Sequence, residues 1–238
     1  MTAARKYKRR SNQVEREQRR MERREQVRKR NEPPILTKEE ERFNAISHGA
    51  GAVLAAVCTA LLLRKSESAF AVLASLVYGV SMIVMMLMSC IYHAMPSGSG
   101  AKRVCRRFDY TSIFLLIGGT FAPILLIYLG GKLGMILFCI QWGVILAGAA
   151  WILTFGPGKW RWLPFTLYFL IGWSGVAFIP EFWRHARTLL WFILMGGLVY
   201  TAGMIPFARK QKYDHCVWHM FVLTGAILHW IGIYTQIY

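Results

Sequence analysis

Charged residues are scarce in this 238-residue chain, of which only 17% is Asp, Glu, Lys or Arg, against about 25% in an ordinary soluble domain. Residues 44–238 hold just 18 of the 41 charged residues, while hydrophobic residues make up 55% of the whole sequence. Such a low charge density over such a long stretch excludes a soluble enzyme and a disordered protein. It indicates an integral membrane domain.

Cysteine is scarce as well, and its distribution excludes a secreted scaffold built on disulfides. The five cysteines are scattered, odd in number and without a Cys-x-x-Cys spacing. We therefore interpret them as apolar packing residues. A signal peptide is not expected, because the charged N-terminal region is far too long and the first apolar run lacks a small-residue cleavage site.

Acidic residues are few outside the N-terminal region: residues 1–43 contain 8 of the 12, together with 15 of the 29 basic residues. Residues 1–36 are predicted to form a basic tail that is either disordered or a surface helix. Pro33 and Pro34 interrupt any helix there, and Thr37-Lys38-Glu39-Glu40 fits a capping box that starts a new helix near residue 38. The tail contains one aromatic residue, Tyr7, which favours anionic lipid over nucleic acid as its partner.

Seven apolar segments follow, and each is long enough to cross the hydrocarbon layer of a membrane as a helix. They lie at about 44–63, 69–95, 109–130, 133–155, 162–180, 188–208 and 215–237. Continuous runs of about twenty residues favour helices over the alternating strands of a membrane barrel. The sequence thus predicts an all-α integral membrane protein, with seven transmembrane helices in a domain over residues 37–238.

The distribution of basic residues predicts the orientation of these helices. With seven antiparallel spans, the tail and three loops share one side of the membrane and carry 24 of the 29 Lys and Arg residues, while the other side carries 5. Cytoplasmic loops are the ones enriched in Lys and Arg. We therefore expect the N-terminus in the cytoplasm and the C-terminus outside.

Ionisable residues are rare within the apolar segments, and each one is a hypothesis for function. The predicted orientation places six of these ionisable residues, which come from distant parts of the sequence, at the cytoplasmic ends of their helices. They are Glu41, His48, His93, Asp109, His215 and His219. His229 lies ten residues beyond His219 and hence about 15 Å deeper, and His185 falls in an outer loop.

The spacing of these residues matches the faces of helices. Glu41, Asn44 and His48 stand at i, i+3 and i+7 and share one stripe, and Ser89 shares a face with His93 four residues later. Each group has a structural interpretation too. The first three residues can form a hydrogen-bond cluster between helices, and Ser89 can serve as a small residue at a helix interface.

His215 and His219 are four residues apart, a spacing that lets two imidazoles face one metal ion. A third histidine would leave one coordination position open for water, which is the pattern of a catalytic zinc site. The alternative is packing or hydrogen bonding between helices without a metal. For Asp109, the alternative is an acidic cap at the start of the third apolar segment.

Taken together, these motifs resemble the hemolysin III branch of the progestin and adipoQ receptor superfamily of seven-helix membrane proteins. The resemblance covers about residues 37–238 and rests on three motifs in order. They are Glu41-x-x-Asn44-x-x-Ser47-His48, Ser89-x-x-x-His93 followed by Asp109, and His215-x-x-x-His219 followed by His229. Ser47 stands where threonine is commoner in the family, and the basic tail lies outside the resemblance.

This resemblance implies a zinc ion held by His93, His215 and His219. The catalytic residues that it implies are Asp109 and Ser89, and the residues that would support the ligands are Glu41, Asn44 and His48. The implied activity is hydrolysis of a lipid amide or ester, as in membrane ceramidases, which have a similar constellation. The lipid would enter sideways from the inner leaflet. The implied location is a bacterial inner membrane, with the tail in the cytoplasm.

Two other functions stay open at this point. The zinc could be structural, in a non-catalytic regulator or sensor of membrane composition and energetics. The family name suggests a cytolytic pore, but helices this hydrophobic do not suit a soluble, secreted state, and an ion channel would need more polar stripes. An open, water-bearing metal position would favour hydrolysis, and four protein ligands would favour a structural role.

Overall fold

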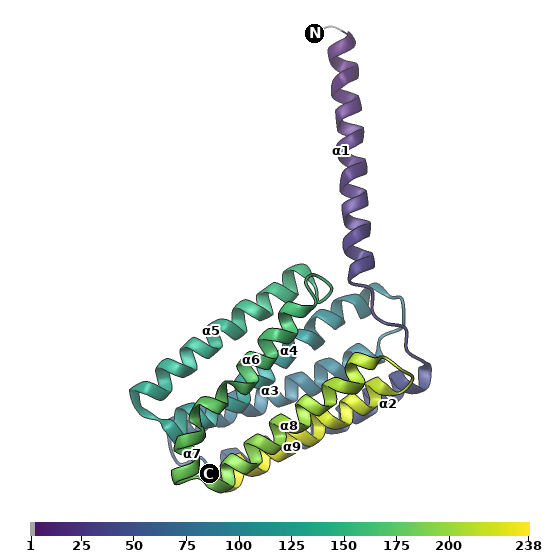
Figure 1. The fold of residues 1–238 in the computed structure, drawn as a ribbon. Helices are drawn as coiled ribbons and strands as arrows, with labels where there is room; N and C mark the ends of the chain where they lie inside the picture. Colours follow the sequence, from purple (N-terminus) through teal and green to yellow (C-terminus); the bar gives the residue numbers. More distant parts are fainter. Residues whose placement is uncertain (1–2) are drawn as a thin grey trace.

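The computed structural model describes residues 3–238 and shows a bundle of helices from which one long helix projects (Figure 1). In chain order the elements are α1 (Ala3–Arg30), α2 (Lys38–Lys65), α3 (Ala69–Ala94), α4 (Gly100–Pro123), the π-helical turn η1 (Ile124–Leu129), α5 (Gly131–Phe155), α6 (Trp162–Trp173), the short 3-10 helix η2 (Ser174–Phe178), α7 (Ile179–His185), α8 (Arg187–Arg209) and α9 (Asp214–Gln236). No strand occurs in residues 3–238, which confirms the predicted all-α class.

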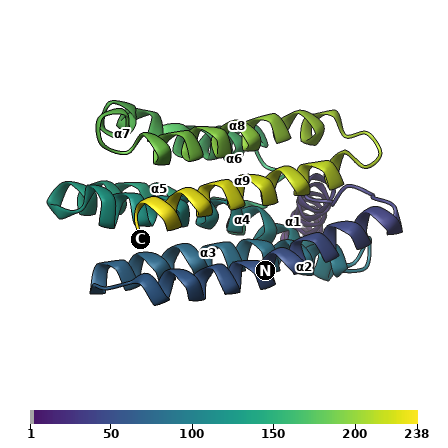
Figure 2. The ribbon, with the colours of Figure 1, turned by 90° about the horizontal axis from the view of Figure 1, so that it is seen from below.

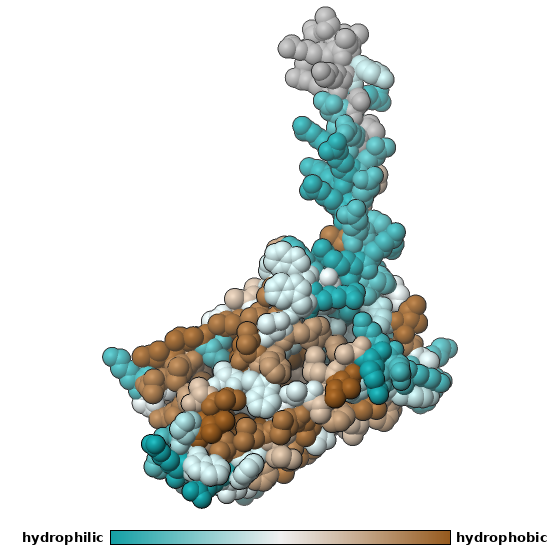
Figure 3. All heavy atoms as spheres, viewed as in Figure 1, coloured by the Kyte–Doolittle hydropathy of each residue, from teal (hydrophilic) through white to brown (hydrophobic). Residues whose placement is uncertain are grey.

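Seven helical stretches within the described chain are long and apolar enough to cross a membrane, as predicted. Five coincide with α2, α3, α5, α8 and α9. The other two are composite, because α4 continues into η1 over Gly100–Leu129, and α6, η2 and α7 together form Trp162–His185. Figure 3 shows apolar side chains over the bundle surface and hydrophilic ones along α1. The bundle is therefore an integral membrane domain.

The helices pack in an order that brings the first and last spans together. α2 packs against both α3 and α9, α3 packs against α4, and α8 packs against α9. Figure 2 shows α9 lying between α8 on one side and the α2–α3 pair on the other. α4 is the most enclosed span, with 67% of its apolar window buried. Residues at corresponding ends of α2, α3, α4 and α9 consequently face one another.

The seven spans alternate in direction, so the bundle has two distinct ends. We call the end at which α1 joins it the α1 end; the C-terminus lies at the opposite end (Figure 1). α2 starts at the α1 end with the predicted capping box. The Thr37 side chain accepts a hydrogen bond from the Glu40 backbone at 3.3 Å, and the Glu40 carboxylate accepts one from the Thr37 backbone at 2.9 Å.

The start of α4 differs from the sequence-based expectation. The helix begins at Gly100, where Ser99 accepts a hydrogen bond from the Lys102 backbone at 3.0 Å, and not near residue 109. Asp109 therefore lies in the third turn, and its interpretation as an acidic helix cap is wrong. The basic residues between 102 and 107 concealed this start, because they interrupt the apolar run without interrupting the helix.

The basic helix α1 is tied to the bundle at its C-terminal end. The Asn31 side chain donates a hydrogen bond to the Phe155 carbonyl at 3.2 Å and accepts one from the Gly158 backbone at 2.9 Å. Arg106 donates to the backbone carbonyls of Asn31 and Glu32 at 3.2 Å and 3.0 Å. In both ribbon views α1 runs at a steep angle to the bundle helices (Figures 1 and 2). These contacts fix the base of α1 on the bundle.

Candidate metal centre

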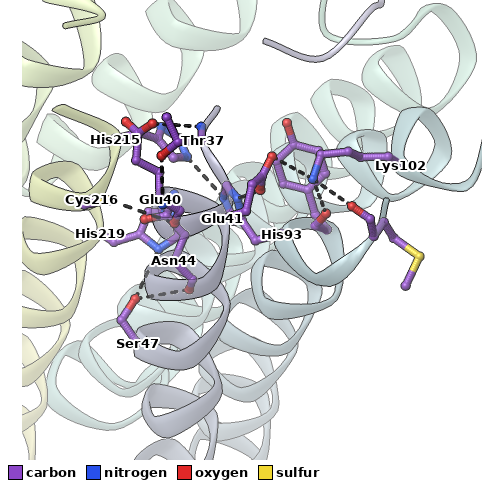
Figure 4. Close-up of polar contacts among 12 residues, drawn as sticks. Thr37, Glu40, Glu41, Asn44, Ser47, His93, Lys102, His215, Cys216 and His219 are labelled. Carbon is purple, nitrogen blue, oxygen red and sulfur yellow. Dashed lines mark hydrogen bonds and ion pairs between the residues drawn. The ribbon is translucent and has the colours of Figure 1, made fainter. Parts of the chain in front are cut away.

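Three histidines meet at the α1 end of the bundle, one from α3 and two from the first turns of α9 (Figure 4). One ring nitrogen from each of His93, His215 and His219 lies within 4.8 Å of the others. The Nε2 atoms of His93 and His215 are 3.2 Å apart. Because His215 and His219 are one helical turn apart, the start of α9 presents both rings to the same point.

A carboxylate from α2 holds the His93 ring in place. Nδ1 of His93 lies 2.7 Å from Oε2 of Glu41, and Nζ of Lys102 lies 2.9 Å from Oε1 of the same carboxylate. A carboxylate can only accept, so His93 donates from Nδ1 and turns the lone pair of Nε2 toward the other two histidines. Histidine ligands of metals commonly have such a partner, which fixes the tautomer and raises the basicity of the ligand.

Lys102 is a participant in this arrangement that we did not predict from the sequence. The distribution of basic residues predicts that Lys102 lies in a loop, but only 1% of the residue is exposed. Besides Glu41, its ammonium group contacts the carbonyls of Tyr92 and Met95, each at 3.1 Å. A signal was available: Lys102 stands seven residues before Asp109, so the two share one face of α4.

The capping box of α2 also positions the start of α9. Oε1 of Glu40 accepts a hydrogen bond from the Tyr213 backbone at 2.7 Å, while its other oxygen caps α2. The Cys216 thiol donates a longer contact of 3.9 Å to the Glu40 carbonyl. One residue of α2 therefore ties down the turn in front of His215, a link that sequence spacing did not reveal.

The ring of His219 is held from the side of α2. His48 stacks on it with the ring centroids 3.8 Å apart, and the Ser47 hydroxyl lies 3.5 Å from its Nδ1, which leaves Nε2 as its free nitrogen. Asn44 is completely buried nearby, and His48 is 2% exposed. The side-chain polar atoms of Asn44 and both ring nitrogens of His48 find no hydrogen-bond partner in the described part of the chain.

Asp109 and Ser89 lie near the histidines, and both line a cavity of about 220 Å³. The Ser89 hydroxyl neighbours the Asp109 carboxylate, so α3 and α4 each contribute one of the two groups. The Asp109 carboxylate lies outside the group of three converging ligand atoms. It faces the same space as His215 and His219, at a position from which it can act on a bound molecule.

The cavity itself is mostly apolar and extends from the histidines toward the other end of the bundle. Its walls come from α3, α4, α6, α8 and α9, with His48 of α2 beside the histidines, and it reaches as far as His229. Phe169 and Gly172, which are exposed on the bundle surface, also line it, so it opens sideways beside α6. The hydrogen bond from Trp173 to Thr201, at 3.1 Å, bridges α6 and α8 along this opening.

The structure thus gathers the polar residues that the sequence analysis placed at one depth, while His185 lies apart from them near Glu181. His229 belongs to a deeper level, as expected from its position along the helix. The donor set fits a metal ion such as zinc: three imidazole nitrogens converge, at least one ring is held by a carboxylate, and buried polar atoms lie around them. The individual roles of these residues stay predictions.

Comparisons with known proteins cover the same part of the chain. Residues 36–230 match the family model described as Haemolysin-III related, so α1 lies outside the match. The chain is 34% identical to Hemolysin-3 of Bacillus cereus over 197 residues, which are 79% of this chain and 88% of that protein. It is 30% identical to the Hemolysin-3 homolog of Bacillus subtilis (strain 168) over 197 residues, 81% and 92% of the two chains. The monocyte to macrophage differentiation factor of Homo sapiens is 24% identical over 205 residues, 84% and 85% of the two chains.

Proposed function

Given that this chain belongs to the haemolysin-III-related family of membrane proteins, we propose that it binds zinc and hydrolyses an amide or ester bond of a membrane lipid. The observation that carries the proposal is a three-histidine cluster, two of whose rings line an apolar cavity together with an acid and a hydroxyl. A metal site of purely structural importance has no need of such a cavity.

His93, His215 and His219 would hold the metal, and two of these ligands, His215 and His219, line the cavity. When bound at such a site, zinc acidifies water and polarises a carbonyl group. Glu41 keeps the His93 lone pair directed at the centre, and Lys102 balances the charge of Glu41. Glu40 accepts a hydrogen bond from the backbone just before α9, and this contact holds the helix turn that carries His215 and His219 in place.

Asp109 is the group that moves protons in this mechanism. Its carboxylate takes a proton from the attacking water as the oxygen adds to the acyl carbon, and it returns that proton to the leaving amine or alcohol as the carbon–nitrogen or carbon–oxygen bond breaks. The products are the fatty acid and the amine or alcohol, so water supplies every atom that is gained. The Ser89 hydroxyl orients Asp109 or donates a hydrogen bond to the acyl oxygen.

The shape of the cavity selects a lipid over a water-soluble substrate. Its apolar walls suit an acyl chain, and its sideways opening beside Phe169 and Gly172 faces the region that the bilayer would occupy. A lipid can thus enter from the membrane with its polar bond next to the histidines and its chain pointing deeper. Apolar walls also keep bulk water away from the bond being broken.

The experiment that tests this function combines zinc content with a screen of lipid amides and esters on detergent-purified protein. We expect the wild type to release fatty acid, and Asp109→Asn to lose at least about 100-fold in rate while it retains zinc. His185→Ala is the matched control and should keep both properties. Zinc binding without any turnover on the panel would instead favour a regulator with structural zinc, and lysis of added cells by the purified protein would favour a cytolysin.

We further propose that the α1 end is cytoplasmic, in a bacterial inner membrane. That end carries α1, the loops around residues 95–99 and 156–161 and the turn before α9, with most of the basic residues, whereas the opposite end carries Arg64, Lys65, Lys132, Arg184 and Arg187. Trypsin should cut α1 in inside-out vesicles and leave it intact in spheroplasts. Cleavage in spheroplasts would reverse the orientation.

The partner that we propose for α1 is the anionic lipid surface. α1 contains 13 Lys and Arg residues and 4 Glu, and its steep angle to the bundle brings it closer to the headgroups than a helix that continued the bundle axis. In nanodiscs of phosphatidylglycerol, α1 should be cut by trypsin several-fold more slowly than in phosphatidylcholine. About 0.5 M salt should remove the difference, because it screens exposed charges. Equal cleavage in both lipids at low salt would rule this partner out.

A further inference from the structure

The far end of the cavity contains a second group of polar side chains that the proposed hydrolysis does not use. His229 on α9 and Tyr200 on α8 both line the cavity, with their ring centroids 5.5 Å apart. His229 follows His219 by ten residues, so the two are separated by about 15 Å along the helix. A smaller adjoining pocket of about 40 Å³ shares His229 and continues toward the end opposite α1.

The hydrogen bonding of His229 leaves one nitrogen free. Its Nε2 lies 3.1 Å from the carbonyl oxygen of Ile193, which can only accept. Nε2 therefore carries the proton, and Nδ1 is an acceptor. Nδ1 is buried and has no partner among the residues of the structure, 3–238. An acceptor without a donor inside an apolar environment is costly, so a bound group that donates to it is favoured.

Tyr200 is in a matching situation. Its hydroxyl is also buried and has no hydrogen-bond partner in the described residues. The neighbouring hydroxyls have already used their donors: Thr120 donates to the Leu116 carbonyl, and Thr201 donates to the Gly197 carbonyl while it accepts from Trp173. At this end of the cavity, Nδ1 of His229 and the hydroxyl of Tyr200 are thus polar groups without a partner among the described residues.

The packing of α8 against α9 is shaped to hold these two rings. A Cβ atom on Gly196 of α8 would collide with the His229 ring. A Cβ atom on Gly225 of α9 would come within 2.8 Å of the Tyr200 ring. Each helix thus lacks a side chain where the other inserts its ring, and the reciprocal arrangement places both rings at the cavity wall.

We propose that His229 and Tyr200 form a second binding site, which holds a neutral hydroxyl or amide N–H group of the ligand about 15 Å from the histidine cluster along α9. The group must donate, because Nδ1 of His229 accepts, and the Tyr200 hydroxyl can donate back to its oxygen. It must be neutral, because Asp109 at the opposite end is the one acidic or basic residue besides histidine that lines the cavity. The ligand is therefore an amphiphile with two polar groups separated by an apolar segment.

The identity of the group at the histidine cluster rests on the proposed function, but the second site can be tested without metal or hydrolysis. The probe is dodecanol with a photoreactive diazirine beside the hydroxyl carbon. The matched control probe is its methyl ether, which keeps the oxygen but cannot donate a hydrogen bond. After illumination of the full-length protein in detergent, the labelled residues are mapped by mass spectrometry.

We expect the alcohol to label the segments around Tyr200 and His229 about fivefold more than the ether does, the effect of one net hydrogen bond. His229→Phe and Tyr200→Phe should each reduce this ratio toward one, and the exposed Gly143→Ala should leave it unchanged. Equal labelling by the two probes in the wild type would overturn the proposal, as would a preference that survives in both Phe variants. A protein that failed to bind zinc would still give this labelling ratio. Failure of the proposed hydrolysis can therefore be distinguished from failure of the second binding site.

Discussion

The cavity has a histidine near each of its two ends, and each histidine donates one hydrogen bond to an oxygen atom, from Nδ1 at the α1 end and from Nε2 at the far end. At the α1 end, His93 donates from Nδ1 to the Glu41 carboxylate, and two more histidines stand beside it. At the far end, His229 bonds through Nε2 to the Ile193 carbonyl and has Tyr200 as its neighbour. A ring backed by a carboxylate and joined by two others suits a cation, whereas an isolated ring backed by a carbonyl suits a neutral donor.

Zinc content should separate the two ends most strongly. His215→Ala removes one of three ligands, so zinc per chain should fall from about one to below about 0.1 after purification. His229→Ala removes a ring that faces the same cavity and should leave zinc at about one. The measurement is metal analysis of protein purified in the same detergent. Zinc loss in His229→Ala, or full zinc content in His215→Ala, would contradict the assignment of the metal site to the α1 end alone.

The carboxylate behind His93 should account for the next largest effect. Glu41→Gln should lower zinc affinity by about 10-fold to 100-fold, because the ligand loses its charged partner. Chelator competition measures this affinity.

The same variant leaves the buried Lys102 without its counter-ion, so stability should also fall by about 3–5 kcal/mol. Adding Lys102→Met should recover the stability without recovering zinc affinity. Recovery of both properties would mean that Glu41 acts on folding alone and not on the metal ligand.

At the far end of the cavity, a substitution beside His229 should lower the stability of the protein and leave its zinc content unchanged. Gly196→Ala forces a methyl group against the His229 ring and should destabilise the protein by about 1–3 kcal/mol. Gly143→Ala is the matched control, since nothing lies within 4 Å of its added methyl group. Thermal unfolding in detergent gives both values, and zinc content should stay at about one in each. If both variants melted alike, the packing argument for the second site would fail.

The smallest expected effect concerns the ring stacked on His219. His48→Phe keeps the stack and should change zinc affinity by less than about threefold, whereas His48→Ala loses it and should cost about threefold to tenfold. Chelator competition again gives the numbers. A large loss in His48→Phe would show that a nitrogen of His48, and not its stacked face, supports the centre.

Much of the fold could be predicted because its signals are local in sequence. Each span is a continuous apolar run, and the capping box at Thr37 is a four-residue pattern. The convergence of His93 with His215 and His219 at one depth followed from counting spans and basic residues. These predictions need no knowledge of which helix packs against which.

Other features depended on neighbours that are distant in sequence. Lys102 looks like a loop charge until α2 brings Glu41 to it, 61 residues away in the chain. The start of α4 was missed for the same reason, since a buried lysine does not resemble a membrane residue. Tyr200 carried no signal at all, because its role depends on a glycine in another helix.

By itself, therefore, the sequence determined seven membrane-spanning helices, a basic arm outside them and a set of histidines and acids confined to one end. These properties follow from hydropathy, charge and helical spacing, which act over a few residues. Only the tertiary structure decided which nitrogen of His93 and of His229 donates, which charges are paired, and that one cavity connects His219 to His229. The physical reason is that hydrogen bonds and packing between helices depend on side-chain shape across the interface, which no single segment contains.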